Sequence, residues 1–142
     1  MSTAPAIEIV TAVITRGDGQ VLVVRKQGST SFIQPGGKRE PGEDALATLA
    51  RELHEELGVQ MVAGSAQRLG LFEDNAVNES GRRVRGEAFL VQVEGTPQVR
   101  AEIAELAWIP LQPPHGVTLA PLSQHHILPA AVAALAAQKA PA

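Results

Sequence analysis

The stretch that decides the fold is GKREPGEDALATLARELHEELGV, which runs from Gly37 to Val59. Its second half predicts a helix from Glu43 to Leu57, because acids follow a Pro-Gly pair at its start and Gly58 can end it in a left-handed conformation. At about 100° per residue, the apolar residues of this helix share one stripe. They are Leu46, Leu49, Ala50, Leu53 and Leu57. We expect this stripe to face the core.

Three carboxylates form a patch on another side of the same helix. Glu52, Glu55 and Glu56 are spaced i, i+3, i+4, and the small residues Ala45 and Thr48 leave room above them. The acids lie near the negative end of the helix dipole, which costs roughly 0.3–1 kcal/mol for each charge, and no lysine at i+4 relieves them. A solvated acidic face is the ordinary interpretation. A bound Mg²⁺ or Mn²⁺ would remove both penalties, and we favour it.

The glycine loop before the helix is suited to close approach by a ligand. Gly36-Gly37 has no side chain in the way, so a glycine carbonyl could join the metal shell. Lys38 and Arg39 add positive charge where a phosphate chain would approach. Arg25-Lys26 ends a predicted strand, and its two side chains point to opposite faces, so one of them could also contact a phosphate.

These residues resemble a known family. From Gly37 to Val59 the chain reads GX5EX7RELXEEXGV, which is similar without a departure to the full box of the Nudix hydrolases. The flanks, FIQPGG at 32–37 and AELAWIP at 104–110, are also similar to segments of that family. The resemblance implies one Nudix domain over residues 1–142, an α/β/α sandwich with a mixed β-sheet. It also implies cleavage of a diphosphate linked to another group.

The resemblance also implies roles for single residues. By this likeness the divalent ions are held by Glu52, Glu55 and Glu56, with the carbonyl of Gly37 as a further ligand. Arg51 would orient Glu52, and Glu43 would be a supporting hydrogen-bond partner. The general base would be Glu52 or a glutamate of a later loop. The later candidates are Glu102 and Glu105, followed by the weaker Glu87 and Glu94.

The rest of the chain predicts mainly strands. Extended segments are expected at residues 7–15, 20–26, 59–63, 67–74 and 83–94. Arg16–Gly19 and Asn78–Gly81 are predicted turns. Glu102–Pro110 is a short element whose type the sequence leaves open. Ser123–Lys139 is helical in composition, with Pro129 in a first turn.

Composition narrows the class of protein. The 142 residues contain no cysteine, which excludes disulfides and cysteine-ligated zinc, and the net charge of -3 comes with no basic block that would suggest nucleic-acid binding. No apolar stretch is long enough to span a bilayer, and the first residues do not resemble a signal peptide. We therefore expect a cytoplasmic protein with no membrane or nucleic-acid partner. A homodimer is compatible with the sequence but not required by it.

With this resemblance, the sequence favours a Mg²⁺-dependent pyrophosphohydrolase that cleaves a nucleoside diphosphate linked to another group. The type that acts on nucleoside triphosphates, including oxidised ones, is favoured. The alternatives are an ADP-ribose or nucleotide-sugar pyrophosphatase and a non-catalytic nucleotide-binding module, which usually lacks some of the box acids. Phe72, Phe89 and Trp108 could stack on a base, although core positions fit them better. His125-His126 is an unfavourable metal pair, because adjacent helical residues do not converge on one ion.

Overall fold

The computed structural model describes residues 5–77 and 81–139 of the chain. The strands within these ranges are β1 (Ile7–Arg16), β2 (Gln20–Lys26), β3 (Gly36–Gly37), β4 (Gln60–Met61), β5 (Gln67–Asn75), β6 (Arg83–Val91), β7 (Val93–Glu94) and β8 (Ile103–Pro110). The helices are α1 (Ala45–Leu57), the π-helical turn η1 (Ser123–Ile127) and α2 (Leu128–Lys139). Of the turn predicted at Asn78–Gly81, residues 78–80 lie outside the described residues.

The main sheet is mixed, as predicted. Its strand order is β5-β6-β1-β2-β8. β1 runs parallel to β6 along Ile7–Ile14, while the hairpin at Arg16–Gly19 joins it to the antiparallel β2 only near its end. The glycine pair of β3 occupies the edge of β1 that β2 leaves open, with Gly36 opposite Thr11. This pairing brings the glycine loop into the sheet.

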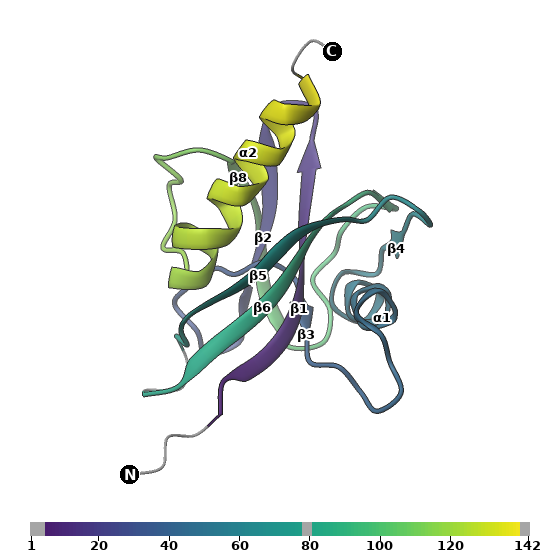
Figure 1. Cartoon of the computed structure of the whole chain (residues 1–142), viewed down its shortest axis with the longest axis vertical. Helices are drawn as coiled ribbons and strands as arrows, with labels where there is room; N and C mark the ends of the chain where they lie inside the picture. The colour runs from purple at the N-terminus through teal and green to yellow at the C-terminus, as the bar shows by residue number, and fades with distance from the viewer. Residues whose placement is uncertain (1–4, 78–80, 140–142) are drawn as a thin grey trace.

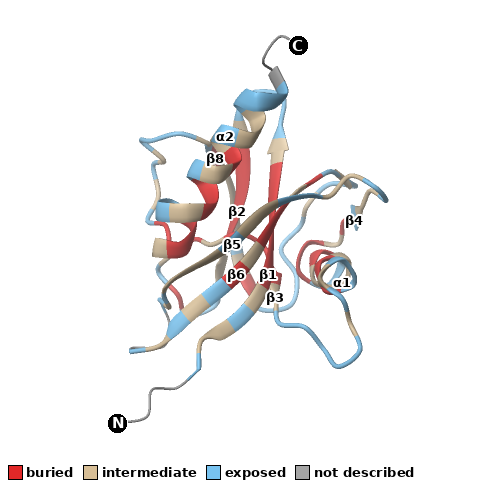
Figure 2. Ribbon diagram, in the orientation of Figure 1, coloured by how far each residue is buried: buried red, intermediate tan, exposed pale blue. Residues whose placement is uncertain are grey.

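The two helices cover opposite faces of the sheet, which confirms the predicted sandwich (Figure 1). Side chains alternate along β1, so that Val10, Ala12 and Ile14 join the core under α1, whereas Val13 joins the core under α2. Figure 2 shows the buried residues running along the central strands and on the inner sides of the helices. No helix among the described residues is long and apolar enough to cross a membrane.

Helix α1 begins two residues later than predicted. Its first residue is Ala45, and the carboxylate of Asp44 caps it by accepting the N–H of Ala47 at 2.8 Å. Glu43 therefore precedes the helix. The end is as predicted, because Gly58 has a left-handed φ of 70°.

The buried side of α1 is centred nearer the acids than predicted. Leu49, Leu53 and Leu57 are fully buried, but Leu46 is 41% exposed, so its assignment to the core was wrong. Thr48 and Glu56 are buried instead. The side of α1 that faces the sheet therefore includes Glu56 of the acidic patch but does not include Leu46 in the first turn. One acid is therefore held against the core.

Several predicted elements are refined in type or extent. The undetermined segment at 102–110 is strand β8, which pairs antiparallel with β2. The segment at 83–94 is divided into β6 and the short β7, which pairs with β4. The C-terminal helical segment begins with the π-helical turn η1 before it continues as α2, whose second residue is Pro129.

Candidate active site

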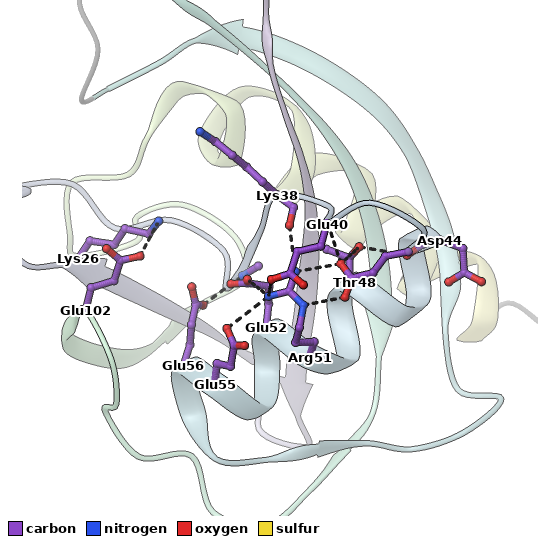
Figure 3. A network of polar contacts seen from close by, with 12 residues as sticks. Lys26, Lys38, Glu40, Asp44, Thr48, Arg51, Glu52, Glu55, Glu56 and Glu102 are labelled. Carbon is purple, nitrogen blue, oxygen red and sulfur yellow. Dashed lines mark hydrogen bonds and ion pairs between the residues drawn. The ribbon is translucent and has the colours of Figure 1, made fainter.

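Arg51 is the centre of a carboxylate network on α1 (Figure 3). Its Nε and Nη2 donate to the two carboxylate oxygens of Glu43 at 2.7 and 2.9 Å. Its Nη1 donates to Glu52 Oε1 at 2.6 Å and to Glu55 Oε2 at 3.3 Å. The guanidinium also donates to the Lys38 carbonyl at 3.1 Å, which ties the helix to the glycine loop. Arg51 thereby fixes Glu52, as the resemblance implies.

The network favours the charged forms of its members. The hydrogen bonds from Arg51 lower the pKa of Glu43 to about 2, helped by the backbone N–H of Glu40 and the hydroxyl of Thr48. The same bonds to Glu43 raise the pKa of Arg51. Glu43 accepts these bonds from the loop before α1, because the helix begins only at Ala45.

Glu56 is the buried acid of the patch. It is 3% exposed, and the Gly36 N–H donates to its Oε1 at 3.3 Å. Burial, with a smaller contribution from the nearby charge of Glu52, raises its pKa to about 8. In Figure 3 the ion pair between Lys26 and Glu102, with 3.7 Å between Nζ and Oε1, lies beside it. A group of this kind holds a proton near neutral pH unless a cation displaces it.

The two glycines of β3 are required for different reasons. A Cβ on Gly36 would lie 2.0 Å from the Val10 carbonyl oxygen, and its φ of +150° is unfavourable for other residues. A Cβ on Gly37 would lie 2.5 Å from Glu52 Oε2. Gly36 thus allows the strand pairing, whereas Gly37 leaves the space above the Glu52 carboxylate open.

A cavity of about 550 Å³ adjoins this network. Its polar lining residues include Arg51 and Glu52, together with Gly37 of the glycine loop. Its apolar lining residues are Ile7, Ile9, Ile33, Val84, Leu122 and Ile127. The volume falls within the range of small-molecule sites, about 300–1,000 Å³.

The structure separates the residues proposed for catalysis and phosphate binding. Those that line the cavity are Lys26, Lys38, Arg39, Arg51, Glu52 and Glu102. Arg25 and Glu105 do not line it, because they form an ion pair with each other at 3.2 Å. Arg39 pairs with Glu87 at 2.9 Å. The Lys38 side chain extends away from the acids in Figure 3.

The aromatic candidates do not line this cavity. Phe89 is buried in the core under α1, and Trp108 packs against the same cluster. Phe72 stacks on His126, with 6.0 Å between the ring centroids. His125 and His126 nevertheless meet at one carboxylate. His125 Nδ1 and His126 Nε2 each donate to Asp74 Oδ2 at 3.1 Å.

The π-helical turn explains this convergence. η1 has a wider turn than an α-helix, so two successive side chains can meet one carboxylate oxygen of β5. The contacts anchor η1 to the sheet. Ser123 and Ile127 of η1, and Leu122 just before it, line the cavity.

The acids suit a divalent cation by residue type. Carboxylate oxygens and a glycine carbonyl are hard donors, the space above Glu52 is open, and Glu56 is a buried acid that a cation would help to ionise. As the side chains stand, no group of three His, Cys, Asp or Glu residues among those described is arranged to hold one ion. Glu55, which is half exposed, is paired with Arg51 at 3.3 Å.

Comparison with known proteins identifies the family. The NUDIX domain model matches residues 7–129. The chain belongs to the NUDIX domain family of hydrolases. It is similar to the solution structure of the Escherichia coli ORF135 protein, with 33% identity, a TM-score of 0.74, and coverage of 96% of this chain and 95% of that one.

Two curated relatives match over shorter stretches. The CTP pyrophosphohydrolase of Escherichia coli strain K12 is 39% identical over 62 residues, which is 41% of this chain and 45% of that protein. The RNA pyrophosphohydrolase of Rhodopseudomonas palustris strain BisA53 is 30% identical over 92 residues, which is 60% of this chain and 50% of that protein. The NUDIX chain spans about half the length of the curated relatives it matches.

Sequence reasoning missed two polar residues of the cavity. Thr11 and Gln34 are buried, they line the cavity, and their side-chain polar atoms have no hydrogen bond to the described protein. The alternation of Ile7, Ile9 and Thr11 on β1 could have suggested a shared face. No sequence signal marks Gln34 as buried, because glutamine beside Pro-Gly-Gly is usually an exposed loop residue.

Proposed function

We propose that this NUDIX protein is a Mg²⁺-dependent pyrophosphohydrolase that cleaves a diphosphate bond in a nucleoside triphosphate-type substrate. The observation that carries the proposal is one cavity lined both by Glu52 of α1 and by apolar residues of β1, β6 and η1. Such a cavity can hold a phosphate chain at one end and a ring at the other. The curated relatives named CTP and RNA pyrophosphohydrolases support the same reaction class.

The acidic end supplies the ligands and the base. In this proposal Glu52, Glu55 and Glu56 hold Mg²⁺, with the Gly37 carbonyl as a further ligand. Bound Mg²⁺ neutralises charge on the phosphate oxygens and lowers the pKa of water. Arg51 keeps the Glu52 carboxylate in one orientation through its 2.6 Å hydrogen bond.

Two glutamates are candidates for the general base. Glu52 lies at the cavity wall with one oxygen, Oε2, facing the space that Gly37 leaves open. Glu102 also lines the cavity, but it is paired with Lys26. Glu105 is less suited, because its ion pair with Arg25 lies outside the cavity lining. We propose Glu52 as the base and Glu102 as the second candidate.

The cations of the cavity wall are proposed to bind the phosphate chain. Lys26 and Arg39 line the cavity with partly exposed side chains, and Lys38 lies between Arg39 and the glycines. Lysine and arginine stabilise phosphate oxygens through charge-assisted hydrogen bonds. Arg25 is a weaker candidate, because it donates to Glu105 and to the Ser29 carbonyl.

The test is a substrate panel with purified protein, with and without Mg²⁺. The four ribonucleoside and four deoxyribonucleoside triphosphates, an oxidised guanine nucleotide, ADP-ribose and a nucleotide sugar are incubated, and the products are separated by chromatography. The proposal expects a nucleoside monophosphate and pyrophosphate from a triphosphate. Preferential cleavage of ADP-ribose or the sugar would replace it with the alternative substrate class, and binding without turnover would indicate a non-catalytic module.

Substitutions test the site assignment. We expect Glu52→Gln and Glu56→Gln to lower kcat by at least about 100-fold, as losses of charged catalytic groups do. Glu94→Gln is the matched control, because Glu94 is an exposed acid of β7 outside the cavity lining. Comparison of Glu52→Gln with Glu102→Gln across pH separates the two candidate bases. Wild-type turnover in both Glu52→Gln and Glu56→Gln would refute the assignment.

A further inference from the structure

Gln34 is a buried amide with an unusual environment. Its side chain is 3% exposed, yet neither Oε1 nor Nε2 has a hydrogen bond to a described protein group. Buried polar atoms are nearly always paired, so each exception calls for an explanation. Gln34 also lines the cavity proposed to hold the substrate. Gln34 therefore brings an unpartnered amide, itself enclosed, to the wall of the cavity.

The backbone around Gln34 is held on both sides. The preceding residue, Ile33, exchanges two 2.8 Å hydrogen bonds with Val24 of β2. The following residue, Pro35, accepts the N–H of Ala12 in β1 at 2.9 Å. Gln34 thus spans the gap between two central strands. A residue fixed in this way can present its amide with little loss of conformational freedom on binding.

A second unpartnered group lies on the neighbouring strand. The Oγ1 of Thr11 is buried and has no hydrogen bond to a described protein group, and the residue is 2% exposed. Thr11 pairs with Gly36, two residues beyond Gln34, and it also lines the cavity. Apolar side chains lie near Thr11. The side chains of Thr11, Ile9 and Leu122 all surround Gly86, and Ile9 and Leu122 also line the cavity. The cavity therefore contains polar atoms set within apolar surfaces.

We propose that Gln34, assisted by Thr11, determines base specificity by hydrogen-bonding the polar edge of a nucleobase held in this cavity. The inference rests on the proposed function, because it places a nucleotide in the same site. A carboxamide offers one donor and one acceptor side by side. The pairing edges of nucleobases also present an adjacent donor and acceptor, but their order in adenine and cytosine is the reverse of that in guanine and uracil, so an amide held in one orientation can tell the two groups apart. The apolar walls would cover the faces of the ring.

The competing explanation is that Gln34 only fills space. A space-filling role predicts that an apolar side chain of similar size preserves ligand preference. A role in base recognition predicts that the apolar variant loses the preference among bases but keeps its affinity for the sugar phosphate. Discrimination among bases therefore separates the two explanations better than overall affinity does.

The experiment measures binding to the full chain by isothermal titration calorimetry. The ligands are AMP, CMP, GMP and UMP, with ribose 5-phosphate as the ligand that lacks a base. The variants are Gln34→Leu and Thr11→Val, which keep similar volume, and Gln60→Leu, a control at an exposed glutamine of β4. Thermal unfolding of each variant is measured in parallel. Gln34→Met replaces Gln34→Leu if the latter does not fold.

We expect wild-type protein and Gln60→Leu to bind one monophosphate at least tenfold more tightly than ribose 5-phosphate. Gln34→Leu should weaken that binding about tenfold, the loss expected for two neutral hydrogen bonds, and Thr11→Val about threefold. Ribose 5-phosphate should bind all variants equally. The Tm of Gln34→Leu should equal or exceed that of wild type, because an unpartnered buried amide is removed.

Three results would overturn the inference. They are wild-type binding without any preference for a base, an unchanged order and spread of affinities in Gln34→Leu, and equal weakening of every ligand including ribose 5-phosphate. Base-selective binding that Gln34→Leu abolishes, in a protein that hydrolyses no nucleotide, would support the inference and refute the proposed function. Hydrolysis with unchanged base preference in Gln34→Leu would do the reverse.

Discussion

Replacement of Glu56 by glutamine should change how the stability of this protein depends on pH. Burial raises the pKa of Glu56 from 4.5 to about 8. One pKa unit corresponds to about 1.4 kcal/mol, so the full shift corresponds to about 5 kcal/mol. Glu56→Gln keeps a carbonyl oxygen that can accept the Gly36 N–H and has no charge at any pH.

The direction of this pH dependence follows from the number of protons that the folded and unfolded states bind. Between pH 4.5 and about 8 the folded protein keeps a proton on Glu56, whereas the unfolded chain has lost it. The favourable contribution of this group is therefore complete below pH 4.5 and is lost as the pH rises through about 8. Across this window the free energy of unfolding of the metal-free protein should fall by about 1.4 kcal/mol per pH unit from this residue alone.

The assay is urea unfolding in a chelating buffer at half-unit steps from pH 5 to 9. The difference in unfolding free energy between Glu56→Gln and wild type should grow in favour of the variant up to about pH 8 and then level off. Glu55→Gln is the matched control, because Glu55 is 51% exposed on the same helix and should leave the slope close to that of wild type. Parallel pH profiles for wild type and Glu56→Gln would refute the reasoning. Added Mg²⁺ should stabilise wild type more at pH 8 than at pH 6, since the ion competes with a proton.

Three other substitutions test single contacts. Gly37→Ala should lower kcat about 100-fold with little change in Tm, because its Cβ would displace the Glu52 carboxylate; steady-state kinetics and thermal unfolding check this. Arg51→Lys should lower kcat/KM by about 10- to 100-fold, because an ammonium cannot make the fork of bonds to Glu43 and Glu52. Leu53→Ala should cost about 2–5 kcal/mol in urea unfolding, since this leucine is fully buried under α1.

Each of these three has an outcome that contradicts it. Wild-type kcat in Gly37→Ala would mean that the space above Glu52 is not used. Equal kcat/KM in Arg51→Lys would show that charge alone suffices at this position. A loss under 1 kcal/mol in Leu53→Ala would place the leucine outside the cooperative core, in conflict with its complete burial.

Local patterns predicted most of the fold. The hairpin at Arg16–Gly19, the end of α1 at Gly58 and the extended segments follow from turn residues and alternation within a few positions. The mixed sheet and the family likewise follow from a motif confined to residues 37–59. The start of α1 was missed by two residues because Asp44, and not an earlier group, accepts the N–H of Ala47.

The errors concern surroundings that sequence spacing does not encode. Leu46 has the helical position of the core leucines, but the sheet does not cover the first turn of α1. Glu105 and Glu102 look equivalent in the sequence, and only strand pairing gives Glu105 a salt bridge with Arg25. His126 joins His125 at one carboxylate because the chain forms a π-helical turn, which the composition of the segment does not reveal.

The residues that break local rules are concentrated around one loop. Gly36 has a backbone conformation suited only to glycine, Gln34 has an unpartnered amide, and Glu56 is an acid held in the core by a bond from Gly36. Gln34 has no hydrogen-bond partner among the described protein groups, and the Gly36 N–H offsets only part of the cost of burying Glu56. Where several rules are broken together, function is the usual reason. A cation beside Glu56 and a base beside Gln34 would relieve the two buried polar groups at the two ends of one substrate.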